Sequence, residues 1–195
     1  MLLTVAGIPA DVGIQQKLTS MHVEEWLNED VFRIRWWFLL VMLAVFACAW
    51  WKLADKSLLP EVVLYATLTT IFVMAIVEYG EELTLWDYPV DILPIFPPLS
   101  SVNLLSLPLI YSLAYQYFKT WKSFLTAALI ATAIICFVIE PLLAWGEFYQ
   151  LLKWKYYYSY PLYLATAISV RALISKINTI TARNQKPESK KQLRR

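Results

Sequence analysis

The sequence predicts an all-α integral membrane protein, a bundle of five transmembrane helices with a short N-terminal interfacial helix. Three observations predict this fold. The chain is 59% apolar and 16% charged, whereas a soluble domain is about 45–50% apolar and about 25% charged. Its tryptophans and tyrosines are numerous, which is typical of proteins whose rings lie at the membrane–water interface. Five apolar runs follow one another along the chain, separated by short polar segments.

These runs divide the chain into three parts. Residues 1–33 form an N-terminal amphipathic or interfacial segment, residues 34–176 form the five-helix transmembrane domain, and residues 177–195 form a basic tail. The tail is polar and lacks aromatic residues, so we expect it to be disordered and to contact anionic lipid headgroups.

The N-terminal segment changes character near Thr19. Before it, Pro9 and Gly13 interrupt any early helix. After it, apolar side chains such as Trp26 and Leu27 alternate with acidic residues. This pattern predicts a short amphipathic helix that lies along the membrane surface. A solvated leader is the alternative interpretation.

Each apolar run has about the length that a bilayer requires, since a hydrocarbon core of about 30 Å needs about 20 helical residues. The first run is bracketed by tryptophan pairs, and Pro60 suits the first turn of the second. Pro108 should kink the third run, and Arg171 should extend from the end of the fifth run to the interface. The predicted spans are Arg35 to Lys52, Leu59 to Val77, Leu99 to Phe118, Ser123 to Ala144 and Tyr157 to Ile174.

Charged residues predict the orientation. Most lysines and arginines fall on the side of the C-terminal tail when five spans are drawn, and the positive-inside rule places that side in the cytoplasm. The N-terminus is then outside, together with an acidic, aromatic and proline-rich connector over residues 86–98. Arg33 and Arg35, directly before the first span, argue against this orientation.

Several function classes are disfavoured by composition. A net charge of +2 is too small to suggest nucleic acid as a partner. His22 is the one histidine, which excludes a multi-histidine metal site. Cys48 and Cys136 lie inside apolar runs, where we interpret them as small hydrophobic residues and not as a disulfide or metal ligands. We therefore expect no metal and no cofactor.

Polar groups on several spans fall near one level. Glu78 lies about 28 Å along the second helix from its cytoplasmic start, and Glu140 about 26 Å along the fourth. Asn103 lies close to the outer start of the third helix. A carboxylate in hydrocarbon is costly and normally faces the bundle or a water-filled cavity. We therefore predict an outward-facing polar pocket; alternatively, both glutamates simply end their helices among lipid headgroups. The candidate binding residues are Glu78, Glu140, Asn103, Trp154, Tyr158 and Ser159.

Several motifs follow one another along the chain: Trp50-Trp51-Lys52, Glu140, Gly146, Trp154-Lys155 and Tyr157-Tyr158-Ser159. Their order resembles a family of small multi-pass membrane proteins of unknown function from spore-forming Gram-positive bacteria. The resemblance covers roughly residues 35–176. It implies a bacterial plasma membrane and a helical bundle, and it supplies no catalytic residue. Its most specific part is the set Glu140, Trp154-Lys155 and Tyr158-Ser159.

Two function classes follow. The first is a non-enzymatic protein of the cell envelope: a sensor, an assembly partner, or a protein that handles small solutes or ions. It is favoured because the sequence has no nucleophile–base pair and no phosphate loop. The second is a membrane enzyme acting on an isoprenoid or another lipid. Gly80, followed by Trp86-Asp87-Tyr88 and Pro94, is weakly similar to the pattern of small membrane lycopene cyclases, although the spacing departs from it. The sequence identifies no protein partner.

Overall fold

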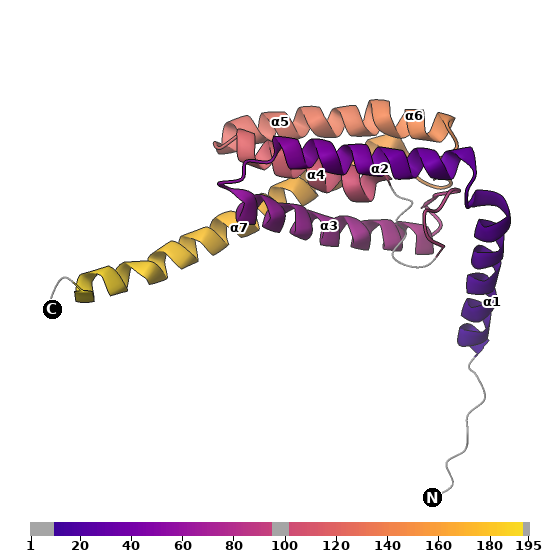
Figure 1. Cartoon of the computed structure of the whole chain (residues 1–195), viewed down its shortest axis with the longest axis horizontal. Coiled ribbons are helices and arrows are strands. Elements are labelled where there is room, and N and C mark those ends of the chain that lie inside the picture. Colours follow the sequence, from indigo (N-terminus) through magenta and orange to yellow (C-terminus); the bar gives the residue numbers. More distant parts are fainter. Residues whose placement is uncertain (1–9, 95–101, 193–195) are drawn as a thin grey trace, which may run out of the picture.

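A computed structural model gives the backbone of residues 10–94 and 102–192 and the side chains of residues 11–94 and 106–184. In the described residues, helices joined by short connections make up the fold, and two of these connections contain a strand of two residues each. Helices α2 to α7 lie side by side along one axis, and α1 runs steeply across the end of this bundle (Figure 1). The all-α prediction is confirmed.

Within the described part of the chain, three helices are long and apolar enough to cross a membrane. They are α2 (Ile34–Leu53), α3 (Leu59–Glu82) and the continuous helix Trp121–Trp145. The last consists of α5 (Trp121–Ile134), the π-helical turn η2 (Ile135–Ile139) and α6 (Glu140–Trp145). They correspond to the first, second and fourth predicted spans, and α3 continues five residues past the predicted end, Val77.

The other two predicted spans fall on α4 and α7. Helix α4 (Val102–Tyr117) has 16 residues, about 24 Å, with Pro108 inside it. Residues 99–101 of that predicted span lie outside the described residues. Helix α7 (Tyr156–Gln192) has 37 residues, about 55 Å, and its C-terminal part leaves the bundle obliquely (Figure 1). Its backbone is helical through Gln192 despite Pro187, whereas the sequence predicts disorder for the tail.

The N-terminal helix begins earlier than predicted. Helix α1 spans Ala10–Glu25 and continues as the π-helical turn η1 (Trp26–Asp30). It starts directly after Pro9 and passes through Gly13, because a proline before a helix costs no hydrogen bond and a single glycine inside one costs only about 1 kcal/mol. Phe32, at a φ of 63°, then turns the chain into α2.

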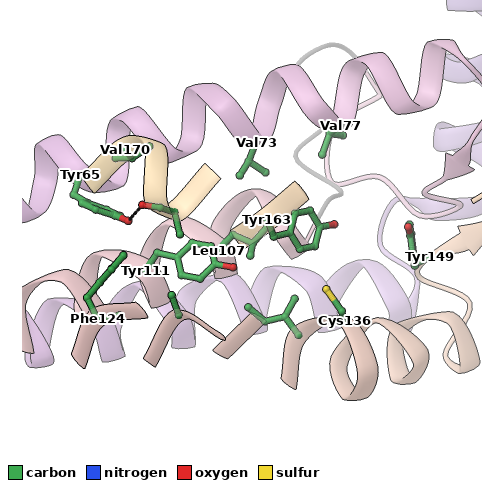
Figure 2. Close-up of a cluster of buried hydrophobic side chains, with 14 of the residues drawn as sticks. Tyr65, Val73, Val77, Leu107, Tyr111, Phe124, Cys136, Tyr149, Tyr163 and Val170 are labelled. Atoms are coloured by element: carbon green, nitrogen blue, oxygen red, sulfur yellow. Dashed lines mark hydrogen bonds between the residues drawn. The ribbon is translucent and has the colours of Figure 1, made fainter. Parts of the chain in front are cut away.

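Aromatic and small side chains fill the core between α3, α4, α5 and α7. Tyr65 of α3 stacks on Tyr115 of α4 with ring centroids 4.8 Å apart, and its hydroxyl donates to the Ala167 carbonyl of α7 at 2.7 Å (Figure 2). Tyr111 of α4 shares a 2.7 Å hydrogen bond with Thr132 of α5. These buried hydrogen bonds fix the register between helices, since each tyrosine hydroxyl would otherwise lack a partner in an apolar interior.

Two connections close one end of the bundle. Strand β1 (Trp86–Asp87), after α3, pairs antiparallel with β2 (Gln150–Leu151), before α7. The backbone amides of Leu152 and Lys153 both donate to the Leu85 carbonyl, at 3.0 and 2.9 Å. We call these paired connections, residues 83–94 and 146–155, the end cap. The predicted connector over residues 86–98 thus has its described part in this cap.

Candidate functional site

The site is built on a row of buried residues along the helix Trp121–Trp145. Phe124, Ala128, Thr132, Cys136 and Glu140 recur every four residues, and each is buried. In a straight α-helix this spacing drifts by about 40° per step, because 3.6 residues make one turn. The wider π-helical turn η2 offsets part of this drift, so Glu140 still faces the bundle interior.

Proline accounts for the position of this wider turn. Pro141 has no amide hydrogen, and its ring clashes with the carbonyl four residues earlier in a regular helix. In the structure, the Glu140 amide donates to the Ile135 carbonyl five residues earlier, which is the π-helical pattern. Single π-helical turns are frequent at functional sites. The Glu140-Pro141 pair therefore both widens the helix and turns a carboxyl inward.

Glu140 has no exposed surface and lies among tyrosines. The Tyr163 hydroxyl, from α7, donates to Glu140 Oε1 at 2.8 Å. Tyr149 of the end cap packs in the same buried cluster, and its ring centroid lies 5.3 Å from that of Tyr88. Figure 2 shows Tyr163, Cys136 and Tyr149 together at one end of the core. We call Glu140, Tyr163, Tyr149 and Tyr88 the carboxyl–tyrosine cluster.

Burial fixes the protonation state of the tyrosine in the cap. Tyr149 is 3% exposed, and burial raises its pKa far above the ordinary value; the neighbouring Tyr88 and Glu140 raise it further. Its hydroxyl therefore keeps its proton throughout the physiological range. The cluster thus offers Glu140 neutral hydroxyl groups that can donate and accept hydrogen bonds.

An aromatic layer in the end cap surrounds the cluster. Trp86 lies against Gly80, where an added Cβ would come within 1.8 Å of the indole ring. The Trp154 ring meets Trp86 edge to face at 5.1 Å, and its Nε1 donates to Ser159 Oγ at 3.0 Å. These contacts hold β1 against the start of α7 and cover the end of the core that faces the end cap.

The predicted site residues separate into two groups. Trp154 donates to Ser159 and packs against the hydrophobic core that contains Tyr88, Tyr149 and Tyr163, and Tyr158 lies half exposed next to Trp154. Glu78 is exposed, because Val77 and Gly80 occupy the buried face of α3 beside it. The structure therefore does not bring Glu78 to Glu140. Asn103 is the second residue of α4, and its side chain lies outside the described residues, so its place in the predicted pocket stays a prediction.

Sequence reasoning missed the tyrosines that surround Glu140. Tyr88 and Tyr163 lie in segments rich in aromatic residues, where interface rings are the ordinary interpretation. The four-residue spacing from Phe124 to Glu140 indicated that Glu140 lies on a buried helix face. A buried carboxyl needs hydrogen-bond donors on a neighbouring segment, so this spacing could have pointed to the tyrosines. The donors themselves come from other segments and depend on tertiary packing.

One prediction at the opposite end of the bundle is wrong. The Arg171 side chain does not extend out of the bundle: it is 5% exposed, and its two terminal nitrogens donate to the carbonyls of Phe118 and Lys119, at 2.8 and 2.6 Å. These carbonyls follow the last turn of α4, where the helix dipole favours a cation. Arg171 thus caps α4 from α7.

The part of the chain that the structure describes contains no group of three or more histidine, cysteine or acidic residues that could hold a metal. No protein-family model, curated protein or solved structure matches the chain. The evidence for its class is therefore physical: three candidate membrane spans imply a lipid bilayer, and one of them carries a buried carboxyl.

Proposed function

We propose that this chain is a multi-pass protein of a bacterial plasma membrane, in which α4 and the first half of α7 also cross the bilayer. This proposal is supported by packing: α4 lies against all three candidate spans and α7 against two of them, α3 and Trp121–Trp145, with Leu107, Tyr111 and Val170 fully buried. Residues 156–174 would be about 28 Å long, which matches the hydrocarbon core. The bacterial plasma membrane in this proposal comes from the resemblance to membrane proteins of spore-forming bacteria.

We further propose that the protein is not an enzyme and that its carboxyl–tyrosine cluster takes up a proton or a small monovalent cation from the outer side. One observation carries this proposal: Glu140 is fully buried in a candidate span, with the Tyr163 hydroxyl donating to it at 2.8 Å. An intramembrane ionisable residue is costly and marks ion or proton sites more often than structural ones.

The chemistry of the cluster fits this role. A protonated carboxyl is neutral and inexpensive to bury, whereas the ionised form requires a nearby cation or donors. Hydroxyls from α7 and from the end cap surround Glu140, and tyrosine ring faces attract cations. Exchange of a proton for a cation at Glu140 would change the interactions that join α6, α7 and the cap. The cap could thereby report the state of the carboxyl.

A hydrophobic carbodiimide provides the test, because such reagents enter membranes and react with protonated carboxyls. The full chain in phospholipid vesicles is treated across a pH series, and the modified residue is identified by mass spectrometry. We expect modification at Glu140 that declines as pH rises, and protection by a monovalent cation if one binds. Glu140→Gln should abolish the modification, and Glu78→Gln should leave it unchanged.

Modification of exposed Glu78 in preference to Glu140, or modification of Glu140 that pH and cations both leave unchanged, would contradict the proposal. Circular dichroism of Glu140→Gln serves as the folding control, since glutamine keeps the shape and a hydrogen-bond acceptor for Tyr163.

A membrane enzyme acting on an isoprenoid remains the second candidate. The Trp86-Asp87-Tyr88 segment, which is weakly similar to the lycopene cyclase pattern, supplies Tyr88 to the carboxyl–tyrosine cluster. A carboxylic acid among aromatic rings could protonate an alkene, and ring faces could stabilise the resulting cation. Expression in a bacterial strain that accumulates lycopene tests this function. Cyclised carotenoid that disappears with Glu140→Gln would favour the enzyme, whereas unchanged lycopene would leave the binding role.

A further inference from the structure

Exposed lysines gather at the end of the bundle opposite the end cap. The turn between α2 and α3 and the turn between α4 and α5 meet there, because the Gln116 side-chain amide donates to the Leu53 carbonyl at 2.8 Å and accepts from the Asp55 amide at 2.9 Å. Helix α7 passes the same place (Figure 1). We call the exposed lysines of this end the basic collar: Lys52, Lys56, Lys119, Lys122 and Lys176.

Exposed aromatic rings lie at the same level as the collar. Trp51 and Trp121 are 56% and 43% exposed, and the Lys56 ammonium lies 3.7 Å from the centroid of the Trp51 ring. Tryptophan and tyrosine rings concentrate where hydrocarbon meets headgroups. The collar lysines therefore lie at the depth of lipid phosphates if α2 and α5 span the bilayer.

Acidic side chains near the collar are already engaged. Asp55 accepts from the Ser57 hydroxyl and amide, at 2.7 and 2.9 Å. Glu61 accepts from Tyr115 and Asn178, both at 3.0 Å. Within the described ranges, the recorded ion pair joins Arg35 to Glu147 at the end-cap side. Among the described residues the collar lysines form no salt bridge with a carboxylate, although the charge of Lys119 helps to lower the pKa of Asp55.

The framework beneath the collar is held by Arg171. Its guanidinium binds the two carbonyls at the end of α4 and lies 5.0 Å from the Trp121 ring and 4.3 Å from the Phe124 ring. Thr120 then caps α5 by accepting from the Ser123 amide at 3.2 Å. The turn that carries Lys119 and Lys122 is therefore fixed at both ends, so these two ammonium groups are presented from a rigid support.

We propose that the basic collar binds the phosphate groups of anionic phospholipids, with Lys119 and Lys122 as its centre, and that this end faces the cytoplasmic leaflet. Charge complementarity selects the partner: five exposed ammonium groups lie beside interfacial rings, the nearby carboxylates of Asp55 and Glu61 accept hydrogen bonds from other side chains, and the cytoplasmic leaflet carries anionic lipid. The opposite end carries most of the acids, including Glu78, Asp87 and Asp91. This inference rests on the proposed membrane location and does not depend on the carboxyl–tyrosine cluster.

The test compares phosphatidylglycerol with phosphatidylcholine. The purified full chain is mixed with each lipid in neutral detergent, and bound lipid is counted by native mass spectrometry. We expect preferential retention of phosphatidylglycerol, and a fall of about tenfold or more in its affinity for the double variant Lys119→Gln/Lys122→Gln. Circular dichroism should be unchanged, because both side chains are exposed.

Two further variants separate the collar from other basic groups. Lys153→Gln/Lys155→Gln removes two exposed lysines from the end cap and should retain the lipid preference. Deletion of residues 183–195 removes the basic tail and should retain most of it. Equal retention of both lipids by the unmodified chain, or equal losses from the collar and end-cap variants, would overturn the proposal.

Orientation is tested separately in intact cells. Lys122→Cys is treated with a membrane-impermeant thiol reagent, with the unsubstituted chain as the blank. We expect labelling only after the cells are opened. Labelling of intact cells would place the collar outside and would refute its assignment to the cytoplasmic leaflet.

Discussion

Replacement of Gly80 by alanine should break the contact between α3 and the end cap. The added Cβ would lie 1.8 Å from Cζ2 of Trp86, well inside van der Waals contact, and the indole has little room because Trp86 is 5% exposed. Expulsion of a tryptophan exposes about 150–250 Å², which at about 25 cal/mol per Å² corresponds to about 4–6 kcal/mol. Alanine returns about 1 kcal/mol of helix propensity. The net destabilisation is about 3–5 kcal/mol.

Thermal unfolding in detergent, followed by circular dichroism, measures this loss. Gly13→Ala is the matched control, since it makes the same change in helix α1 and its Cβ would meet nothing within 4 Å. We expect Gly13→Ala to be neutral or slightly stabilising. The double variant Gly80→Ala/Trp86→Ala should be no less stable than Trp86→Ala alone, because the clash has no partner once the indole is removed.

Two outcomes would refute this reasoning. The first is a Gly80→Ala protein that unfolds at the same temperature as the unmodified chain, which would mean that Trp86 does not lie on Gly80. The second is a set of additive losses in the double variant, which would mean that the two residues act independently.

Three further predictions concern polar groups. Arg171→Met should cost about 2–4 kcal/mol of stability, because the carbonyls after α4 lose two charged donors. Arg171→Lys should restore only part of this stability, since lysine lacks the guanidinium fork. Thermal unfolding of both variants measures the difference. Glu140→Leu should lower stability and expression more than Glu140→Gln, because leucine leaves the Tyr163 hydroxyl without its acceptor; equal effects would contradict the hydrogen-bonded site. The Ser57 hydroxyl and amide lower the pKa of Asp55, so the Asp55 carboxylate should stabilise the fold above its unfolded pKa of about 4, and this contribution should be lost as pH falls through the folded value. Asp55→Ala should therefore be less stable than the unmodified chain at pH 7 and equally stable at low pH. A stability difference that does not depend on pH would exclude this linkage.

Local rules account for most of the helical content. The apolar runs locate α2, α3 and the helix Trp121–Trp145, because burial of about 20 apolar residues in lipid requires a helix whose backbone is satisfied internally. The same rules placed Pro60 in a first turn, where the structure has it. They were less successful at the N-terminus, where helix α1 passes through Gly13 because a weak local penalty does not end a helix.

The sequence by itself determined that this chain contains several apolar helices and that Glu140, beside Pro141, is an unusual residue within one of them. Only the tertiary structure decided that Glu140 faces inward, that Glu78 on α3 faces away, and that Arg171 caps a neighbouring helix. The physical reason is the range of the interactions. Hydropathy and proline effects act within a few residues along the chain, whereas the partner of a buried polar group is supplied by another helix whose rotation only packing fixes.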